Sequence, residues 1–327
     1  MGTPARKADH LRIAAGDGVV HRASTGLEDV HLRHRALPPR ELEDVDLSTE
    51  LLGSRLDAPL IVSAMTGGTP AAIDVNDRLA HAAAGLGVGM VLGSGRALLD
   101  DPSLLRTYRG PTRPPLLLAN LGAAALTPWD AERVVEMVGA DGLCVHLNPI
   151  QEAIQPEGDT RFGGALERIA ACVETLAPRP VVVKEVGFGM DPRDVVAVRR
   201  AGVAAVDVAG AGGTNWALVE GRRDRDAGRV AAAFADWGVP TARAVSGAVA
   251  AAPGLPVIAS GGVRDGVEAA KCLALGAVAC GLARPLLVAA RAGRAREALA
   301  AVVRQLRIAV WATGAPSARA LDASALR

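Results

Sequence analysis

The chain has 327 residues, half of them hydrophobic, which is long for one ordinary domain but normal for an α/β barrel. Its 36 basic and 35 acidic residues leave a net charge of +1, and aromatic residues make up only 2%. This balance argues against a basic surface for nucleic acid or anionic lipid, and against aromatic platforms for stacking bases.

Residues 1–58 precede the first predicted strand, and we expect them to form an N-terminal extension. Their start, MGTPARKADHLRIAAGD, is charged and lacks the apolar centre of a signal peptide. No apolar run in the chain reaches the roughly 18 residues that a membrane helix needs. We therefore expect no membrane partner.

Eight short, nearly continuous apolar runs follow, with helical patterns between them. Such runs are typical of parallel strands that are covered on both faces. They span residues 59–64, 87–92, 115–120, 142–147, 180–185, 204–209, 256–260 and 277–281. The alternation predicts an α/β protein, a (β/α)₈ TIM barrel over residues 59–314 that forms a single domain with the N-terminal extension. A doubly wound sheet is the alternative, but no early G-x-G-x-x-G turn supports it.

Two of the intervening segments show clear helix boundaries. In the helical segment predicted over 127–140, Thr127 suits the cap, Pro128 the first position and Asp130 the first turn. In the segment 265–276, Asp265 suits the cap and Gly276 the end.

The segment between the sixth and seventh strands, residues 210–255, is unusually long. They include the charge run EGRRDRDAGR at 220–229. We expect this run to be a solvated, mobile loop, with an active-site lid as the alternative. The four cysteines, at 144, 172, 272 and 280, form no CxxC pair, and we expect them to be reduced packing residues of a cytoplasmic protein.

Polar or glycine residues follow every predicted strand, at the end where barrel enzymes place their chemistry. The fourth strand is the richest, because His146, Asn148, Gln151 and Glu152 come directly after it. The fifth ends in Lys184, which we expect to point into the barrel mouth, since neighbouring Glu185 must face the other way. An interior lysine is suited to place positive charge beside a flavin.

The turns after the last two strands predict a phosphate site. SGGVRDG (260–266) combines a glycine pair with a helix start, and GLARP (281–285) follows the eighth strand. Glycines let backbone N–H groups approach an anion, and the helix dipole favours negative charge there.

Several of these stretches together resemble the type 2 isopentenyl-diphosphate isomerases, which are FMN-dependent barrel enzymes. The match runs from about residue 6 to about residue 314. Its most specific string is HLNPIQEAIQPEGD, and it is carried as well by RKADH, PLIVSAMTGG, GSGRALL, VKEVGFG, VDVAGAGGTNW and IASGGVRDG. One position departs from the family pattern, because Gly95 stands where the family usually has Gln.

The resemblance implies which residues bind the cofactor. FMN would contact residues at the strand ends, and its phosphate would lie on the last two turns. The implied FMN contacts are Met65, Thr66, Gly67, Ser94, Asn120, Lys184, Thr214, Gly261, Gly262, Arg264, Ala283 and Arg284.

The resemblance also implies the reaction, in which isopentenyl and dimethylallyl diphosphate interconvert by a 1,3-allylic proton shift in isoprenoid biosynthesis. Reduced FMN and Mg²⁺ would be required, with NADPH as the reductant. Glu152 would bind the metal, and a homo-oligomer, tetramer or octamer, is expected. The implied substrate-binding residues are Arg6, Lys7, Arg96, His146 and Gln151, and the implied catalytic residues are Gln151, His146 and Asn148.

Other interpretations of the same residues remain open. From composition alone, Arg6 and Lys7 belong to a frayed basic terminus, His146 is a structural histidine and Glu152 is a surface carboxylate. An FMN-dependent α-hydroxy-acid oxidase would share the barrel, but it needs a late histidine, and the six histidines end at His146. A non-catalytic flavin- or prenyl-diphosphate-binding protein is the remaining alternative.

Overall fold

A computed structural model of the protein describes residues 3–327, in which eight parallel strands close into a barrel. Each strand pairs with the next along the chain, and the last returns to the first. The predicted barrel is thus confirmed, and every strand falls within its predicted run to within two residues. The barrel strands are β3 (Leu60–Val62), β4 (Gly89–Val91), β5 (Leu117–Gly122), β6 (Gly142–Leu147), β7 (Val181–Glu185), β8 (Ala205–Asp207), β9 (Val257–Ala259) and β10 (Ala279–Leu282).

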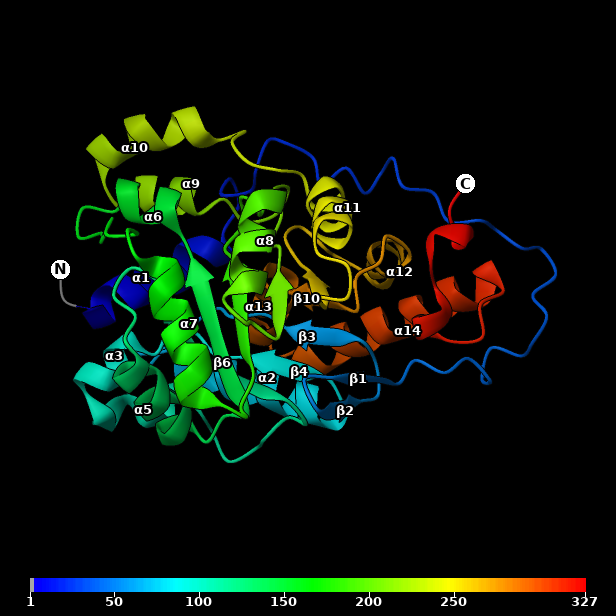
Figure 1. Ribbon diagram of the computed structural model, residues 1–327, viewed down its shortest axis with the longest axis horizontal. Coiled ribbons are helices and arrows are strands. Elements are labelled where there is room, and N and C mark those ends of the chain that lie inside the picture. The colour runs from blue at the N-terminus through cyan, green and yellow to red at the C-terminus, as the bar shows by residue number, and fades with distance from the viewer. Residues whose placement is uncertain (1–2) are drawn as a thin grey trace.

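Helices surround the barrel (Figure 1). The α-helices are α1 (Thr3–Ala15), α2 (Ala72–Gly85), α3 (Arg96–Asp100), α4 (Leu105–Tyr108), α5 (Pro128–Val138), α6 (Pro149–Ile154), α7 (Ala165–Leu176), α8 (Pro192–Arg200), α9 (Trp216–Gly221), α10 (Arg225–Ala231), α11 (Thr241–Ala251), α12 (Gly266–Ala274), α13 (Arg284–Arg291) and α14 (Ala295–Thr313). Short 3₁₀ turns cover Pro102–Leu104, Ala232–Phe234, Ala318–Ala320 and Ala323–Ala325.

The predicted helix caps are confirmed. The Thr127 hydroxyl accepts a hydrogen bond from the backbone N–H of Asp130 at 3.1 Å, and α5 ends at Gly139 in the left-handed region. The Asp265 carboxylate accepts from the N–H groups of Val267 and Glu268, both at 2.9 Å, at the start of α12. Each cap satisfies donors that a helix start leaves free.

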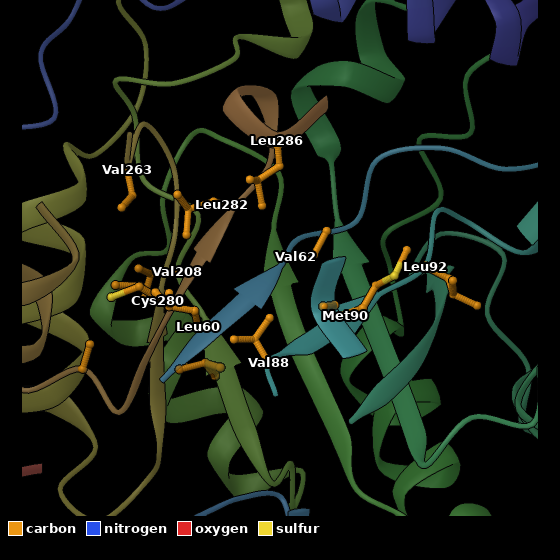
Figure 2. Packing of buried hydrophobic residues seen from close by; sticks show 14 of the residues in the cluster. Leu60, Val62, Val88, Met90, Leu92, Val208, Val263, Cys280, Leu282 and Leu286 are labelled. Carbon is orange, nitrogen blue, oxygen red and sulfur yellow. The ribbon is translucent and has the colours of Figure 1, made fainter. Parts of the chain in front are cut away.

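The barrel separates two hydrophobic cores, which explains why its strands are apolar on both faces. Ile61 and Val182 belong to the core inside the barrel. Leu60, Val62 and Met90 belong to the core between the strands and the helices, part of which Figure 2 shows. Because successive side chains of a strand point to opposite faces, both sets must be apolar.

The N-terminal extension contributes to both ends of the barrel. The antiparallel hairpin of β1 (Thr49–Leu51) and β2 (Ser54–Leu56) packs Leu51 and Leu56 into the interior core, and so closes the end where the strands begin. At the other end, α1 contacts α9 and α13. β6 points towards this end, where α6 and α9 lie (Figure 1).

The prediction that the charge run at 220–229 is a loop is wrong, although Arg222, Asp224 and Arg229 are exposed to solvent as predicted. Its residues form the end of α9 and most of α10, and Glu220 is fully buried. The Arg223 side chain is 6% exposed and pairs with Glu220. Opposite charges within the run and in the neighbouring helices compensate one another, so the run packs against the protein.

The four cysteines are free, buried thiols, as predicted. Burial raises the pKa of Cys144 to about 12 and that of Cys172 to about 11, so both remain protonated packing groups. In the part of the chain that the structure describes, none of the helices combines the length and apolar character needed to span a bilayer.

Candidate functional site

A cavity of about 270 Å³ opens at the carboxyl ends of the barrel strands. Segments far apart in the sequence line it, from α1 to the start of α13. The residues singled out from the sequence that the structure brings together there are Arg6, Lys7, Met65, Thr66, Ser94, Asn120, His146, Asn148, Gln151, Glu152, Lys184, Thr214, Gly261, Gly262, Arg264, Ala283 and Arg284.

Two of the singled-out residues, Gly67 and Arg96, lie outside the cavity lining. Gly67 lies against the ring of Tyr108, which any side chain at position 67 would overlap. The Arg96 guanidinium turns towards α5, where it binds the Asp130 carboxylate at 3.0 Å and the Ala125 carbonyl at 2.6 Å. Arg96 therefore has protein partners for its charge in this conformation.

The turn from β6 into α6 brings three polar residues together. Pro149 occupies the first position of α6, and Asn148 precedes it. The Asn148 amide donates to Gln151 Oε1 at 3.2 Å and to Glu152 Oε1 at 2.8 Å. The second Glu152 oxygen accepts from the backbone N–H of Asp159 at 2.8 Å. These bonds hold the Glu152 carboxylate at the cavity with its charge only partly buried.

Glu220 is the centre of a buried network that sequence reasoning missed. Its carboxylate accepts from Gln151 Nε2 at 2.7 Å and from Arg223 Nη1 at 2.6 Å, and it lies 2.8 Å from His10 Nε2. Although burial opposes ionisation, these partners hold the pKa of Glu220 below its usual value. Because Gln151 lines the cavity, its hydrogen bond to Glu220 connects the buried charge to the cavity wall. The one sequence signal was that Ala217 and Glu220, three apart, share a face of α9 that is otherwise apolar.

The α1 helix places two basic residues, Arg6 and Lys7, at the cavity. Arg6 lies 3.9 Å from the Glu157 carboxylate, and Arg223 binds the same Glu157 oxygen at 2.6 Å. Burial, together with the nearby Arg6 charge, lowers the pKa of Lys7 to about 8. Lys7 is therefore a cation that loses its charge in mildly alkaline solution.

His146 is held in one neutral form. Asn120 Nδ2 donates to the Leu92 carbonyl at 3.0 Å, so Asn120 Oδ1 is left to accept the Nδ1–H of His146 at 2.8 Å. Burial lowers the pKa of His146 to about 3, with the charges of Lys184 and Lys7 adding to the shift. Its Nε2 therefore carries a lone pair and can accept a hydrogen bond, but it cannot donate one in this form.

Lys184 and Glu185 point to opposite sides of β7, as predicted. Lys184 lines the cavity, and its ammonium donates to the Glu185 backbone carbonyl at 2.5 Å. One oxygen of the Glu185 carboxylate accepts the backbone N–H groups of Val186 and Gly187, both at 2.6 Å. Glu185 thus orders the turn after β7, while Lys184 supplies positive charge to the cavity.

Glycines after β8 and β9 form a backbone cradle. Gly261 and Gly262 have φ values of +94° and +73°, in the left-handed region. A side chain at Gly261 would overlap the Gly210 backbone, and one at Gly213 would overlap Gly262. The α12 start beside the cradle is already capped by Asp265, whereas the α13 start at Ala283 has no side-chain cap. The α13 start is the one whose dipole is available to an anion.

Some polar atoms in the cavity wall lack a protein partner. The hydroxyls of Ser63 and Thr66 are buried and have no hydrogen-bond partner within residues 3–327. Both residues line the cavity. Because buried polar groups are almost always satisfied, these hydroxyls, the glycine cradle and Lys184 fit a polar, anionic ligand such as a phosphorylated cofactor.

Among the described residues, no group of three or more His, Cys, Asp and Glu side chains is arranged to hold a metal ion. Glu152 is a single carboxylate at the cavity. This fits a Mg²⁺ that takes most of its oxygens from water and a bound phosphate. It does not fit a metal held by protein alone.

Known proteins resemble this chain in sequence and in fold. Residues 2–98 and 155–327 match the family described as FMN-dependent dehydrogenase. The isopentenyl-diphosphate delta-isomerase of Xanthobacter autotrophicus is 49% identical over 98% of this chain and 96% of its own. That of Methanothermobacter thermautotrophicus is 45% identical over 95% of this chain and 89% of its own.

The fold is also that of a solved flavoprotein. The recombinant flavin-binding domain of baker's yeast flavocytochrome b2 matches with a TM-score of 0.68 over 98% of this chain and 82% of its own, at 20% identity. At that identity the likeness concerns the fold. The sequence matches go further, because they extend over nearly the whole chain and include the strand ends that form the cavity. The chain is therefore an enzyme of the FMN-dependent, type 2 isopentenyl-diphosphate delta-isomerase family.

Proposed function

We propose that this enzyme interconverts isopentenyl and dimethylallyl diphosphate, using reduced FMN and Mg²⁺. The observation that carries the proposal is that one cavity is lined by Lys184 and the glycine cradle, by Gln151 and Glu152 of α6, and by the cations of α1. One side of the cavity then suits a flavin and the other suits a metal-bound diphosphate. In the reaction a C–H bond forms at one carbon, a second breaks two carbons away, and the double bond moves between them without net oxidation.

FMN would occupy the wall formed by the strand ends. Its phosphate would lie between the glycine cradle and the start of α13, and Lys184 would lie beside the ring, together with the unpartnered Thr66 hydroxyl. When bound and reduced, FMN supplies the acid–base group for the proton shift. The residues proposed to hold it are Met65, Thr66, Gly67, Ser94, Asn120, Lys184, Thr214, Gly261, Gly262, Arg264, Ala283 and Arg284.

Arg264 and Arg284 reach the cavity with carboxylate partners of their own. Arg264 Nε binds Glu268 at 2.9 Å, and Arg284 binds Asp17 at 3.1 Å. These pairs hold the guanidinium groups at the cavity. The proposal is that phosphate shares them, which charge-assisted hydrogen bonds permit because each guanidinium has five donors.

The diphosphate would lie between α1 and α6. Arg6 and Lys7 supply positive charge from α1, and Glu152 holds Mg²⁺ against the phosphate oxygens. Neutral His146 offers Nε2 as an acceptor, and it becomes a donor only if the phosphate charge makes it take up a proton. Arg96 joins this set only if it leaves Asp130.

Gln151 would position a proton for transfer. A neutral amide has no pKa suited to a general base. The hydrogen bond from Gln151 Nε2 to Glu220 fixes the amide, so that its oxygen faces Asn148. The proposed catalytic set of Gln151, His146 and Asn148 thus acts by holding the alkene and its protons in place, which lowers the barrier by orientation and electrostatics.

The test is anaerobic turnover of isopentenyl diphosphate by the purified protein with FMN, NADPH and Mg²⁺, followed by proton NMR. We expect dimethylallyl diphosphate to form and the NADPH consumed to reach only about one equivalent per flavin. Oxidation of lactate or glycolate by O₂ without isomerisation would contradict the proposal. NADPH as reductant, a cytoplasmic location and a tetramer or octamer belong to the same proposal, and mass photometry measures the last.

A further inference from the structure

Asp207 is a buried acid at the end of β8 that the proposed reaction does not use. It is 5% exposed and belongs to the strand register in which Asp207 pairs with Lys184 of β7. Residues paired across neighbouring strands point to the same side of the sheet, so both side chains lie on the inner side of the barrel. Lys184 lines the cavity, whereas Asp207 is not among the lining residues.

Ser260 connects Asp207 to the cavity. Its hydroxyl donates to Asp207 Oδ1 at 2.6 Å, and Ser260 itself lines the cavity. The backbone N–H of Ala209 donates to the same oxygen at 3.2 Å. Two donors directed at one oxygen are the arrangement expected of an ionised carboxylate. Burial works against this charge and raises the pKa of Asp207, while the nearby Lys184 charge and the two hydrogen bonds favour it.

Neither hydrogen bond requires a negative charge. An Asn side chain offers the same acceptor oxygen to Ser260 and to Ala209, and it avoids the unfavourable burial of a carboxylate. The Lys184 ammonium is directed to the Glu185 carbonyl, so Asp207 is not needed to satisfy it either. What Asp207 adds at this position is its charge.

We propose that Asp207 is a positioning residue whose negative charge offsets Lys184 beneath the flavin and weakens the binding of the reduced, anionic flavin relative to the oxidised one. This inference rests on the proposed function, in which FMN lies against Lys184. A reduced flavin held less tightly is a stronger base, which suits a proton shift that ends with the flavin unchanged. The charge acts across a few ångströms of protein, where Coulomb interactions remain substantial.

The experiment compares the midpoint potential of bound FMN in wild type, Asp207→Asn, Asp207→Glu and Ser260→Ala holoenzymes. Anaerobic reduction against a reference dye at pH 7 gives each value. We expect Asp207→Asn to favour the reduced flavin about tenfold, which for a two-electron couple is an upward shift of about 30 mV. Asp207→Glu and Ser260→Ala, which both retain a carboxylate, should shift the potential much less.

Three results would overturn the inference. The first is an unchanged potential in a folded, FMN-loaded Asp207→Asn enzyme, and the second is an equal shift in Asp207→Glu. The third is failure of Asp207→Asn to fold or to retain FMN, because Asn keeps both hydrogen bonds and only the charge is lost. Wild-type protein that binds no FMN would refute the proposed function itself, and this is seen before any variant is compared. Wild type that binds FMN but does not isomerise refutes only the reaction, and leaves the comparison of potentials valid.

Discussion

Gln151 Nε2 donates to Glu220 Oε1 at 2.7 Å, a hydrogen bond between residues 69 positions apart that joins α6 to α9 over the cavity. It connects the segment richest in polar residues to a charge run that, by sequence, looked like a solvated loop. The cavity wall is therefore stabilised by a carboxylate with no exposed surface.

Replacing Glu220 by Gln tests this network. The variant leaves the Arg223 guanidinium without the buried one of its two carboxylate partners, and we expect it to lower the free energy of unfolding by about 2–4 kcal/mol. Urea unfolding monitored by circular dichroism measures the change. Glu157→Gln is the matched control, because Glu157 is partly exposed and should contribute less than about 1 kcal/mol. Equal stability of the two variants would show that the buried network does not stabilise this region.

Replacing Glu152 by Gln tests the proposed metal site. The variant keeps the shape of the side chain and removes the negative charge that attracts Mg²⁺. It also loses one of the hydrogen bonds that the two carboxylate oxygens accept from Asn148 and Asp159, because an amide nitrogen cannot accept. We expect the Mg²⁺ concentration for half-maximal turnover to rise by about 10²-fold, with an unchanged flavin spectrum. Glu167→Gln, an exposed carboxylate in the first turn of α7, serves as the control. A Glu152→Gln enzyme with the Mg²⁺ dependence of the wild type would remove Glu152 from the metal site.

Gly261→Ala tests the glycine cradle. Position 261 has φ +94°, and a Cβ there would overlap the Gly210 backbone. Gly254→Ala separates the two effects, since Gly254 has φ +84° with no atom within 4 Å of an added Cβ. We expect Gly254→Ala to lose about 1 kcal/mol of stability with normal FMN affinity. Gly261→Ala should lose more than about 2 kcal/mol and bind FMN at least about tenfold more weakly. Thermal unfolding and flavin fluorescence report the two quantities, and normal FMN binding by folded Gly261→Ala would argue against the cradle.

Lys7 predicts a pH dependence of substrate binding. Its pKa of about 8 means that the side chain is charged below pH 8 and increasingly neutral above it. If the diphosphate binds to this cation, as proposed, kcat/KM for isopentenyl diphosphate should fall as pH rises through about 8. Lys7→Arg, which stays charged, should move that fall to higher pH. Between pH 8 and 10.5 the unfolded chain binds more protons than the folded one, because the pKa of Lys7 is lower in the folded state. The free-energy cost that the charged Lys7 imposes on folding therefore falls as pH rises through this range. An identical pH profile in Lys7→Arg would assign the fall to another group.

The barrel was predictable because its signals are local. Apolar runs such as 180–185 and caps such as Asp265 depend on neighbours within a few residues, and the structure confirms both. The polar residues at the strand ends also converge for a simple reason, since a closed parallel barrel brings all those ends to one side.

What was missed depends on contacts between distant segments. Glu220 contacts Gln151 and His10 only after α1, α6 and α9 come together. The residues next to Glu220 in the sequence therefore give little indication that it is buried. Arg96 has the sequence context of a ligand-binding residue, yet Asp130, 34 positions away, holds it outside the cavity. Asp207 looked like one polar residue in an apolar strand, and only the strand register places it beside Lys184.

The β1–β2 hairpin fills one end of the barrel with Leu51 and Leu56 and so closes that end. Small molecules then enter and leave at the opposite end, beneath α1, so two of them must bind one after the other. If FMN binds against the cradle and the diphosphate above it, as proposed, the second molecule to enter blocks the exit of the first. Release then follows the reverse order, and we expect the flavin to remain bound while the diphosphate exchanges.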